Sequence, residues 1–131
     1  IPQNMQNNPS YKNVTMEVLT FFKYKIDKLH QLGFDKIVID PGFGFGKTIQ
    51  HNYQILNNIK LYTVLKKPIL VGVSRKSMIY KLLESDPSEA LNGTTSLNTI
   101  ALINGANILR VHDVKEAKEV IKLYSFLKEN V

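Results

Sequence analysis

Ile69-Leu70-Val71-Gly72-Val73 is an unbroken apolar run that follows Pro68 and leads into the polar sequence Ser74-Arg75-Lys76-Ser77. An apolar run of this length beside a turn residue predicts a strand that is buried on both faces, as in a parallel sheet. A shorter run of the same kind occurs at Ile37-Val38-Ile39, and Ile108-Leu109-Arg110-Val111 is predicted as a further strand. We therefore expect three strands, separated by segments that are long enough to hold helices.

The segments between these strands show helical periodicity. Apolar residues recur every three or four positions from Val14 to Leu32, and Gly33 is expected to end that helix. Further helices are predicted at residues 52–63, 77–83, 95–104 and 114–127. The resulting order α-β-α-β-α-α-β-α predicts an α/β fold in which crossover helices join three parallel strands, as part of a doubly wound sheet or of a (β/α)8 barrel.

The composition is that of a globular domain. Of the 131 residues 44% are hydrophobic, and no repeat, linker or charge block interrupts them, so we expect a single domain over residues 1–131 with no internal boundary. The absence of cysteine excludes disulfides, thiolate nucleophiles and cysteine-ligated metal sites. No apolar run approaches the roughly 18–20 residues of a membrane-spanning helix, so no membrane partner is expected.

The net charge of +6 favours an anionic partner, either a phosphorylated small molecule or a nucleic acid. Only two of the 17 basic residues are arginines, Arg75 and Arg110, and the lysines are spread along the predicted helices. Surfaces that bind nucleic acid usually carry clustered arginines. The lysines are therefore better explained as solvated helix surface, and we expect no nucleic-acid partner.

Polar and charged residues follow each predicted strand. Asp40 begins the loop after the first strand, Ser74-Arg75-Lys76-Ser77 follows the second, and Arg110, His112 and Asp113 lie at the end of the third. In both parallel architectures the carboxyl ends of the strands form the active-site rim. We therefore expect one rim that carries a carboxylate, cations and a histidine.

Each of these residues also has a structural interpretation. Asp40 is explained equally well as a cap, Lys76 as a solvated residue of a first helical turn, and His112 as a packed histidine. Arg75 fits a structural salt bridge. Asp113 fits the N-cap of the last helix, in a capping box with a glutamate three residues later.

The loop after the first strand ends in Gly46-Lys47-Thr48, which is also the ending of a phosphate-binding P-loop. That motif requires a glycine at the position of Pro41, and the nearest glycine, Gly42, lies one residue too late. Loop length is part of the chemistry because successive backbone N–H groups wrap around the phosphate. The sequence therefore argues against a nucleotide-hydrolysing P-loop.

Three motifs in this order closely resemble dihydropteroate synthase, a pterin-binding TIM-barrel family. They are Asp40-Pro41-Gly42-Phe43-Gly44-Phe45-Gly46-Lys47, Val71-Gly72-Val73-Ser74-Arg75-Lys76-Ser77 and Arg110-Val111-His112-Asp113-Val114. The opening Pro2-Gln3-Asn4-Met5-Gln6 also resembles a segment of that family, which lies after its fifth barrel strand. The resemblance implies that residues 1–131 are the C-terminal portion of the barrel, with three of its strands.

The resemblance also implies an activity and a set of site residues. The family joins hydroxymethyl-dihydropterin diphosphate to 4-aminobenzoate in folate biosynthesis, releasing diphosphate. Asp40 and Lys76 match its catalytic residues, and both also match pterin-binding residues, as do Gly72 and Arg110. The remaining matches are Phe45, Ser74 and Lys76 to the aminobenzoate site, and Arg110 and His112 to the anion pocket for diphosphate.

Further expectations rest on the same resemblance. They are a magnesium ion whose ligands lie in the missing N-terminal part, with no metal ligand in this segment, a cytoplasmic homodimer, and inhibition by sulfonamides. A related pterin-binding methyltransferase family shares the barrel and the carboxylate at Asp40, but the motifs around Lys76 and His112 fit the synthase better. An inactive half-barrel fragment is the other alternative, because three strands cannot close a barrel.

Overall fold

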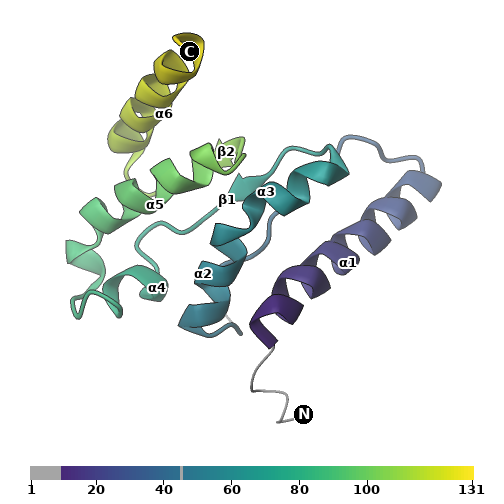
Figure 1. The fold of residues 1–131 in the computed structure, drawn as a ribbon, viewed down its shortest axis with the longest axis horizontal. Coiled ribbons are helices and arrows are strands. Elements are labelled where there is room, and N and C mark those ends of the chain that lie inside the picture. Colours follow the sequence, from purple (N-terminus) through teal and green to yellow (C-terminus); the bar gives the residue numbers. More distant parts are fainter. Residues whose placement is uncertain (1–9, 45) are drawn as a thin grey trace.

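The computed structural model describes residues 10–44 and 46–131, and Figure 1 shows the arrangement of their helices and strands. In chain order the elements are α1 (Ser10–Gln31), α2 (Ile49–Asn57), α3 (Ile59–Tyr62), the 3-10 turn η2 (Thr63–Leu65), β1 (Leu70–Val71), α4 (Ser77–Tyr80), the 3-10 turn η3 (Pro87–Glu89), α5 (Leu91–Ile103), β2 (Ile108–Leu109) and α6 (Val114–Glu129). The predicted α/β class is confirmed.

Strands β1 and β2 are parallel, with Leu70 opposite Ile108. The first predicted strand is reduced to one parallel bridge between Ile39 and Ile69, whose hydrogen bonds are 2.8 and 2.9 Å long. The Arg110 N–H extends the pairing of β2 by donating to the carbonyl of Val71 at 3.0 Å. The three predicted segments therefore lie side by side in parallel, although each regular strand is shorter than predicted.

Helices cover only one face of these strands. Ile69, Val71 and Val73 point to that face and are at most 1% exposed. On the other face Val38 is 49% and Ile108 is 39% exposed, among the residues that the structure describes. The prediction of strands buried on both faces is therefore wrong for this chain, because none of its described helices packs against the second face.

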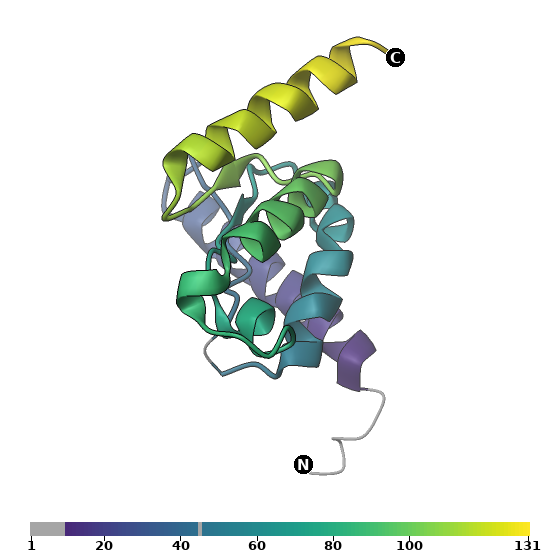
Figure 2. The ribbon, with the colours of Figure 1, turned by 90° about the vertical axis from the view of Figure 1, so that its left-hand side faces the viewer.

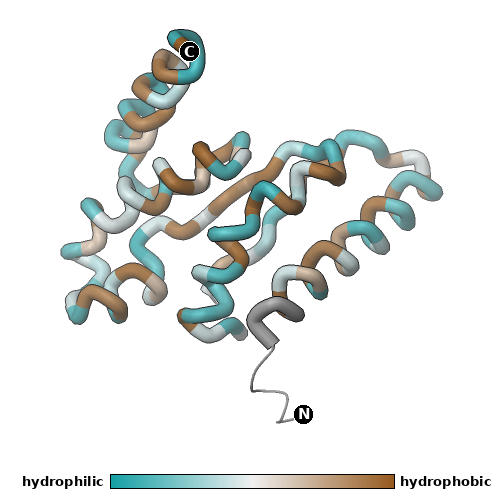
Figure 3. Tube along the Cα trace, in the orientation of Figure 1, coloured by the Kyte–Doolittle hydropathy of each residue, from teal (hydrophilic) through white to brown (hydrophobic). Residues whose placement is uncertain are grey.

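The covered face belongs to a core that ties α1 to α3. Tyr62 is fully buried, meets the ring of Phe22 edge-on at a centroid distance of 5.6 Å, and donates its hydroxyl to the carbonyl of Thr15 at 3.1 Å. Burial raises the pKa of Tyr62 to about 12. Figure 3 shows the corresponding concentration of hydrophobic residues along the central strands.

Two predicted helix starts are wrong. The helix predicted from residue 52 begins at Ile49, because the Thr48 side chain accepts the N–H of His51 and so caps it. The helix predicted from residue 95 begins four residues earlier, at Leu91. The predicted stop at Gly33 is confirmed by its left-handed φ of 92°, a conformation that glycine adopts without penalty.

Helix α6 packs on α5 and extends away from the rest of the molecule (Figure 2). Ala117 and Val120 are its buried residues. Within residues 10–44 and 46–131, no helix has the length and hydropathy needed to cross a membrane.

Candidate functional site

Asp40 lies directly after the bridge residue Ile39, and both of its carboxylate oxygens have partners. Oδ1 accepts the N–H of Gly42 at 2.9 Å, which fixes the orientation of the carboxylate. Oδ2 accepts Nη1 of Arg110 at 2.8 Å, in an ion pair between residues 70 positions apart. The structure therefore brings together Asp40 and Arg110, as the three strand ends predicted.

Arg110 reaches Asp40 across Gly72. The strand register places Asp40, Gly72 and Arg110 on the same face, the one that no described helix covers. A Cβ added to Gly72 would clash with Nη2 of Arg110 and lie only 2.8 Å from its Cζ. The absence of a side chain at Gly72 is therefore what allows the guanidinium to lie against the strand backbone.

Lys76 reaches the same rim from the loop after β1. Its half-buried side chain donates Nζ to the carbonyl of Phe43 at 2.8 Å. Burial, followed by the positive charges of Arg110 and Lys47, holds the pKa of Lys76 below its ordinary value, and Asp40 opposes the shift. One carboxylate thus shares the rim with a group of cations, which is the electrostatic setting for an anionic ligand.

Ser74 and His112 form a separate pair on this rim. The Ser74 hydroxyl lies 2.7 Å from Nδ1 of His112 and also accepts the backbone N–H of His112 at 3.1 Å. Ser74 is only 5% exposed, whereas the His112 residue is exposed. The observed role of Ser74 is therefore to hold His112, and its assignment to the aminobenzoate site stays a prediction.

Asn52 is a structural part of the site that the sequence did not reveal. It lies inside α2, is 2% exposed, and contacts the glycine-rich loop. Its Oδ1 accepts the N–H of Gly44 at 2.8 Å and its Nδ2 donates to the carbonyl of Thr48 at 2.9 Å. Asn52 thereby fixes the loop whose Phe43 carbonyl holds Lys76. An asparagine four residues after the capping threonine was the available signal.

Three backbone N–H groups of this loop donate to acceptors within the protein. The N–H of Gly42 donates to Asp40, that of Gly44 to Asn52, and that of Lys47 to the Gly44 carbonyl at 3.1 Å. The Lys47 ammonium donates to the Gly42 carbonyl at 2.6 Å. These three N–H groups and the Lys47 ammonium are therefore engaged within the protein.

Arg75 forms the structural salt bridge that the sequence suggested. It donates Nε and Nη2 to the two carboxylate oxygens of Asp113 at 2.9 and 3.1 Å, and Nη1 to the carbonyl of Pro87 at 2.6 Å. Asp113 therefore occupies the N-cap position of α6 without a capping hydrogen bond, and the predicted capping box is wrong. The bond with Arg75 lowers the pKa of Asp113.

Arg75 also holds the loop between Ser74 and Lys76 in a left-handed backbone conformation. Its φ is 54°, and its N–H donates to the Thr94 hydroxyl at 2.9 Å. A non-glycine residue rarely adopts this φ without support from its surroundings. The Asp113 and Thr94 contacts supply that support.

Two features predicted from the sequence fall outside the described residues. They are Phe45, assigned to the aminobenzoate site, and the segment Pro2–Gln6. The other phenylalanine of the glycine-rich loop, Phe43, is 4% exposed and packs in the core.

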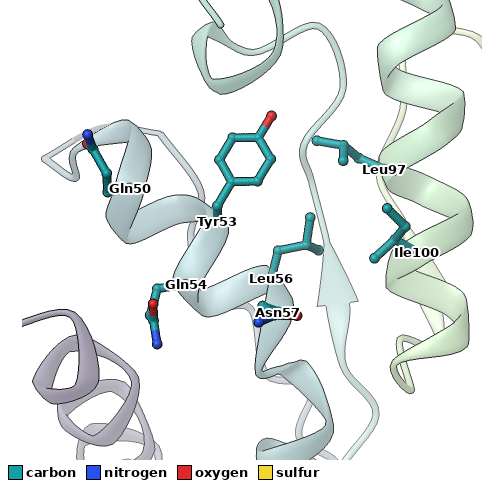
Figure 4. Close-up of a pocket in the computed structure, with 7 residues that line it drawn as sticks. All are labelled: Gln50, Tyr53, Gln54, Leu56, Asn57, Leu97 and Ile100. Atoms are coloured by element: carbon teal, nitrogen blue, oxygen red, sulfur yellow. The ribbon is translucent and has the colours of Figure 1, made fainter.

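A hollow of about 490 Å³ lies between α2 and α5, away from these residues (Figure 4). Tyr53, Leu56, Leu97 and Ile100 line it, together with three amide side chains of α2. The Tyr53 hydroxyl donates to the carbonyl of Met78 at 2.8 Å. Among the described residues, those that line this hollow carry no carboxylate, imidazole, ammonium or guanidinium group.

Within residues 10–44 and 46–131, no group of three or more histidine, cysteine, aspartate or glutamate residues is placed to hold a metal ion. The described residues therefore do not by themselves fit the magnesium ion that the resemblance implies, and that ion stays a prediction.

Comparison with known proteins identifies the family. Residues 1–112 match the family described as "Pterin binding enzyme". The chain belongs to the pterin-binding enzyme family. Asp40, Lys76 and Arg110 therefore lie at the ends of parallel strands in a member of this family.

Several proteins similar to this chain are dihydropteroate synthases. The chain is 44% identical to the dihydropteroate synthase of Escherichia coli (strain K12) over 124 residues. This aligned segment is 93% of the chain and 44% of that protein. The 7,8-dihydropteroate synthase of Vibrio fischeri ES114 superposes with a TM-score of 0.87 at 40% identity, covering all of the chain and 49% of that protein.

A third similar protein is the Yersinia pestis dihydropteroate synthase in complex with a sulfonamide drug, with a TM-score of 0.88 and 38% identity over 99% of the chain and 48% of that protein. The likeness to such structures implies a TIM-barrel fold. The chain spans about half the length of the relatives that it matches.

Proposed function

We propose that this chain is the C-terminal portion of a dihydropteroate synthase and supplies one side of its active site. The observation that carries the proposal is the convergence of Asp40, Gly72, Lys76 and Arg110 on one rim, in a member of the pterin-binding enzyme family. The reaction transfers the dihydropterin-methyl group of hydroxymethyl-dihydropterin diphosphate to 4-aminobenzoate and releases diphosphate.

The uncovered face of the strands supports the barrel. Val38, Leu70 and Ile108 are apolar side chains on the same face as Asp40 and Arg110. Parallel sheets normally have both faces buried. In a closed (β/α)8 barrel, helices bury one face of the strands and side chains of the other strands bury the second. Closure of such a barrel would therefore bury the apolar face that is exposed in this chain.

The proposed roles follow from the chemistry of each group. The Asp40 carboxylate binds the guanidine-like edge of the pterin through two N–H bonds and stabilises positive charge on the ring. The C–O bond to the diphosphate breaks, the amine nitrogen of aminobenzoate bonds to the methylene carbon, and the amine proton is released. We infer that the charges of Lys76 and Arg110 stabilise the departing diphosphate, with His112 beside them as a further hydrogen-bonding group.

Other parts of the proposal rest on the family. We place Phe45, Ser74 and Lys76 near the aminobenzoate, and expect sulfonamides to compete there, in line with the sulfonamide complex of the Yersinia pestis enzyme. Magnesium, with ligands outside this chain, would add positive charge beside the diphosphate. A cytoplasmic homodimer completes the proposal.

The direct test is Asp40→Asn in the polypeptide that carries this sequence. Losing one charge-assisted bond costs about 1.5–3 kcal/mol, so pterin affinity should fall by at least tenfold while the circular dichroism spectrum is unchanged. Asp35→Asn, the same change in an exposed loop residue that precedes this strand, is the matched control. Wild-type pterin affinity in Asp40→Asn would refute the role of Asp40.

An inactive half-barrel is distinguished by assaying the 131 residues alone. We expect association in light scattering and no dihydropteroate formation from the isolated chain, and formation of product when the remainder of the barrel is present. A monodisperse, active monomer of 131 residues would contradict the barrel proposal.

A further inference from the structure

The ion pair between Asp40 and Arg110 lies where the proposed function places the pterin. Asp40 Oδ1 is held by the Gly42 N–H, so Oδ2 is the oxygen directed at an incoming ligand, and Arg110 Nη1 already occupies it at 2.8 Å. Cζ and Nε of Arg110 lie 2.8 and 2.9 Å from the position of a Cβ on Gly72. The guanidinium therefore also fills the space above the glycine.

A guanidinium and the edge of a pterin present the same hydrogen-bonding pattern. Each offers parallel N–H groups on a planar N–C–N unit to a carboxylate, and in this structure Arg110 donates one of them to Asp40. Both would use Oδ2 of Asp40 and the open space over Gly72. The two ligands of Asp40 therefore exclude each other, and a pterin must displace Arg110.

The displaced side chain would lie close to a second cation, Lys76. Lys76 is close enough for the charge of Arg110 to lower its pKa, and His112 lies two residues farther along the chain. Leaving Asp40 for this environment is unfavourable unless an anion is present there. A diphosphate between these groups supplies that anion.

We propose that Arg110 is a specificity-determining residue, because it blocks Asp40 in the ligand-free protein and is drawn away only by the diphosphate of the substrate. The inference rests on the proposed function. In this role Arg110 lowers the affinity for a pterin that lacks diphosphate, because the two compete for Asp40. Stacking of Arg110 on the pterin would instead raise that affinity. Arg110 and Asp40 have side-chain exposures of 54% and 35%, so the competing ion pair is weak and the block is modest.

The test compares binding of 6-hydroxymethylpterin and of its diphosphate ester by isothermal titration calorimetry, in the polypeptide that carries this sequence. Arg110→Ala should bind the free pterin about two- to fivefold more tightly than wild type, the range that an exposed ion pair implies. The same variant should bind the diphosphate ester at least tenfold more weakly. Arg110→Gln provides a second variant, whose side chain is longer than that of alanine and carries no charge.

His112→Ala is the matched control, because it removes a neighbouring group of the anion pocket that has no contact with Asp40. It should weaken binding of the ester and leave the free pterin unchanged. In wild type, saturating inorganic diphosphate should tighten binding of free pterin, and this gain should be absent in Arg110→Ala.

Two results would overturn the inference while preserving the proposed function. They are weaker or unchanged binding of free pterin in both Arg110 variants, and a lack of any effect of inorganic diphosphate on wild type. Failure of wild type to bind either pterin would instead refute the proposed function itself.

Discussion

Replacing Asn52 by leucine tests whether one buried amide organises the glycine-rich loop. Leucine removes the acceptor of the Gly44 N–H and the donor to the Thr48 carbonyl. The Gly44 N–H is left without its partner, which costs about 1–3 kcal/mol. The Thr48 carbonyl still accepts the backbone N–H of residue 52 at 3.1 Å, so losing the side-chain donor costs about 0.5–1.5 kcal/mol. We expect a total destabilisation of about 1.5–4.5 kcal/mol.

Urea denaturation followed by circular dichroism measures this change as a difference in the free energy of unfolding. Asn57→Leu is the matched control, because the same substitution at an exposed position of α2 should change that free energy by less than about 0.5 kcal/mol. Asn52→Leu should also lower pterin affinity, since the Phe43 carbonyl that holds Lys76 belongs to the same loop. Equal stability of Asn52→Leu and Asn57→Leu would refute the reasoning.

Three further predictions concern the rim and the core. The lowered pKa of Lys76 predicts that pterin affinity declines with rising pH before the ordinary lysine pKa of 10.5 is reached. Arg110→Ala should shift this decline to higher pH, because the variant removes a like charge beside Lys76. Calorimetric titrations at a series of pH values in both proteins measure the shift. The pKa of Tyr62, raised to about 12, predicts stability that is fully present below pH 10 and decreases by about 2–3 kcal/mol as the pH rises towards 12. Tyr62→Phe should abolish this alkaline loss, at a cost of about 0.5–1.5 kcal/mol in neutral urea melts. Gly93→Ala should destabilise the protein by about 1–3 kcal/mol, because the added methyl clashes with a buried α4 side chain; an unchanged urea midpoint would contradict that packing.

Much of the fold could be predicted from local patterns. The apolar run Ile69–Val73 and the segments 37–39 and 108–111 predicted parallel strands, because strands of such sheets are rich in apolar residues. The helix starts were predicted less well: the hydrophobic pattern did not show that Thr48 caps α2 or that α5 begins at Leu91. Caps depend on hydrogen bonds of individual side chains, and periodicity does not report them.

For the site, the sequence by itself determined which chemical groups follow each strand, and therefore that Asp40, Lys76 and Arg110 share a rim. Only the tertiary structure decided how they pair. Arg110 binds Asp40 across 70 residues, and Arg75 binds Asp113 instead of leaving it to cap α6. The physical reason is that composition and spacing fix the edge at which a side chain emerges, whereas its partner depends on distances of about 3 Å between segments remote in the chain.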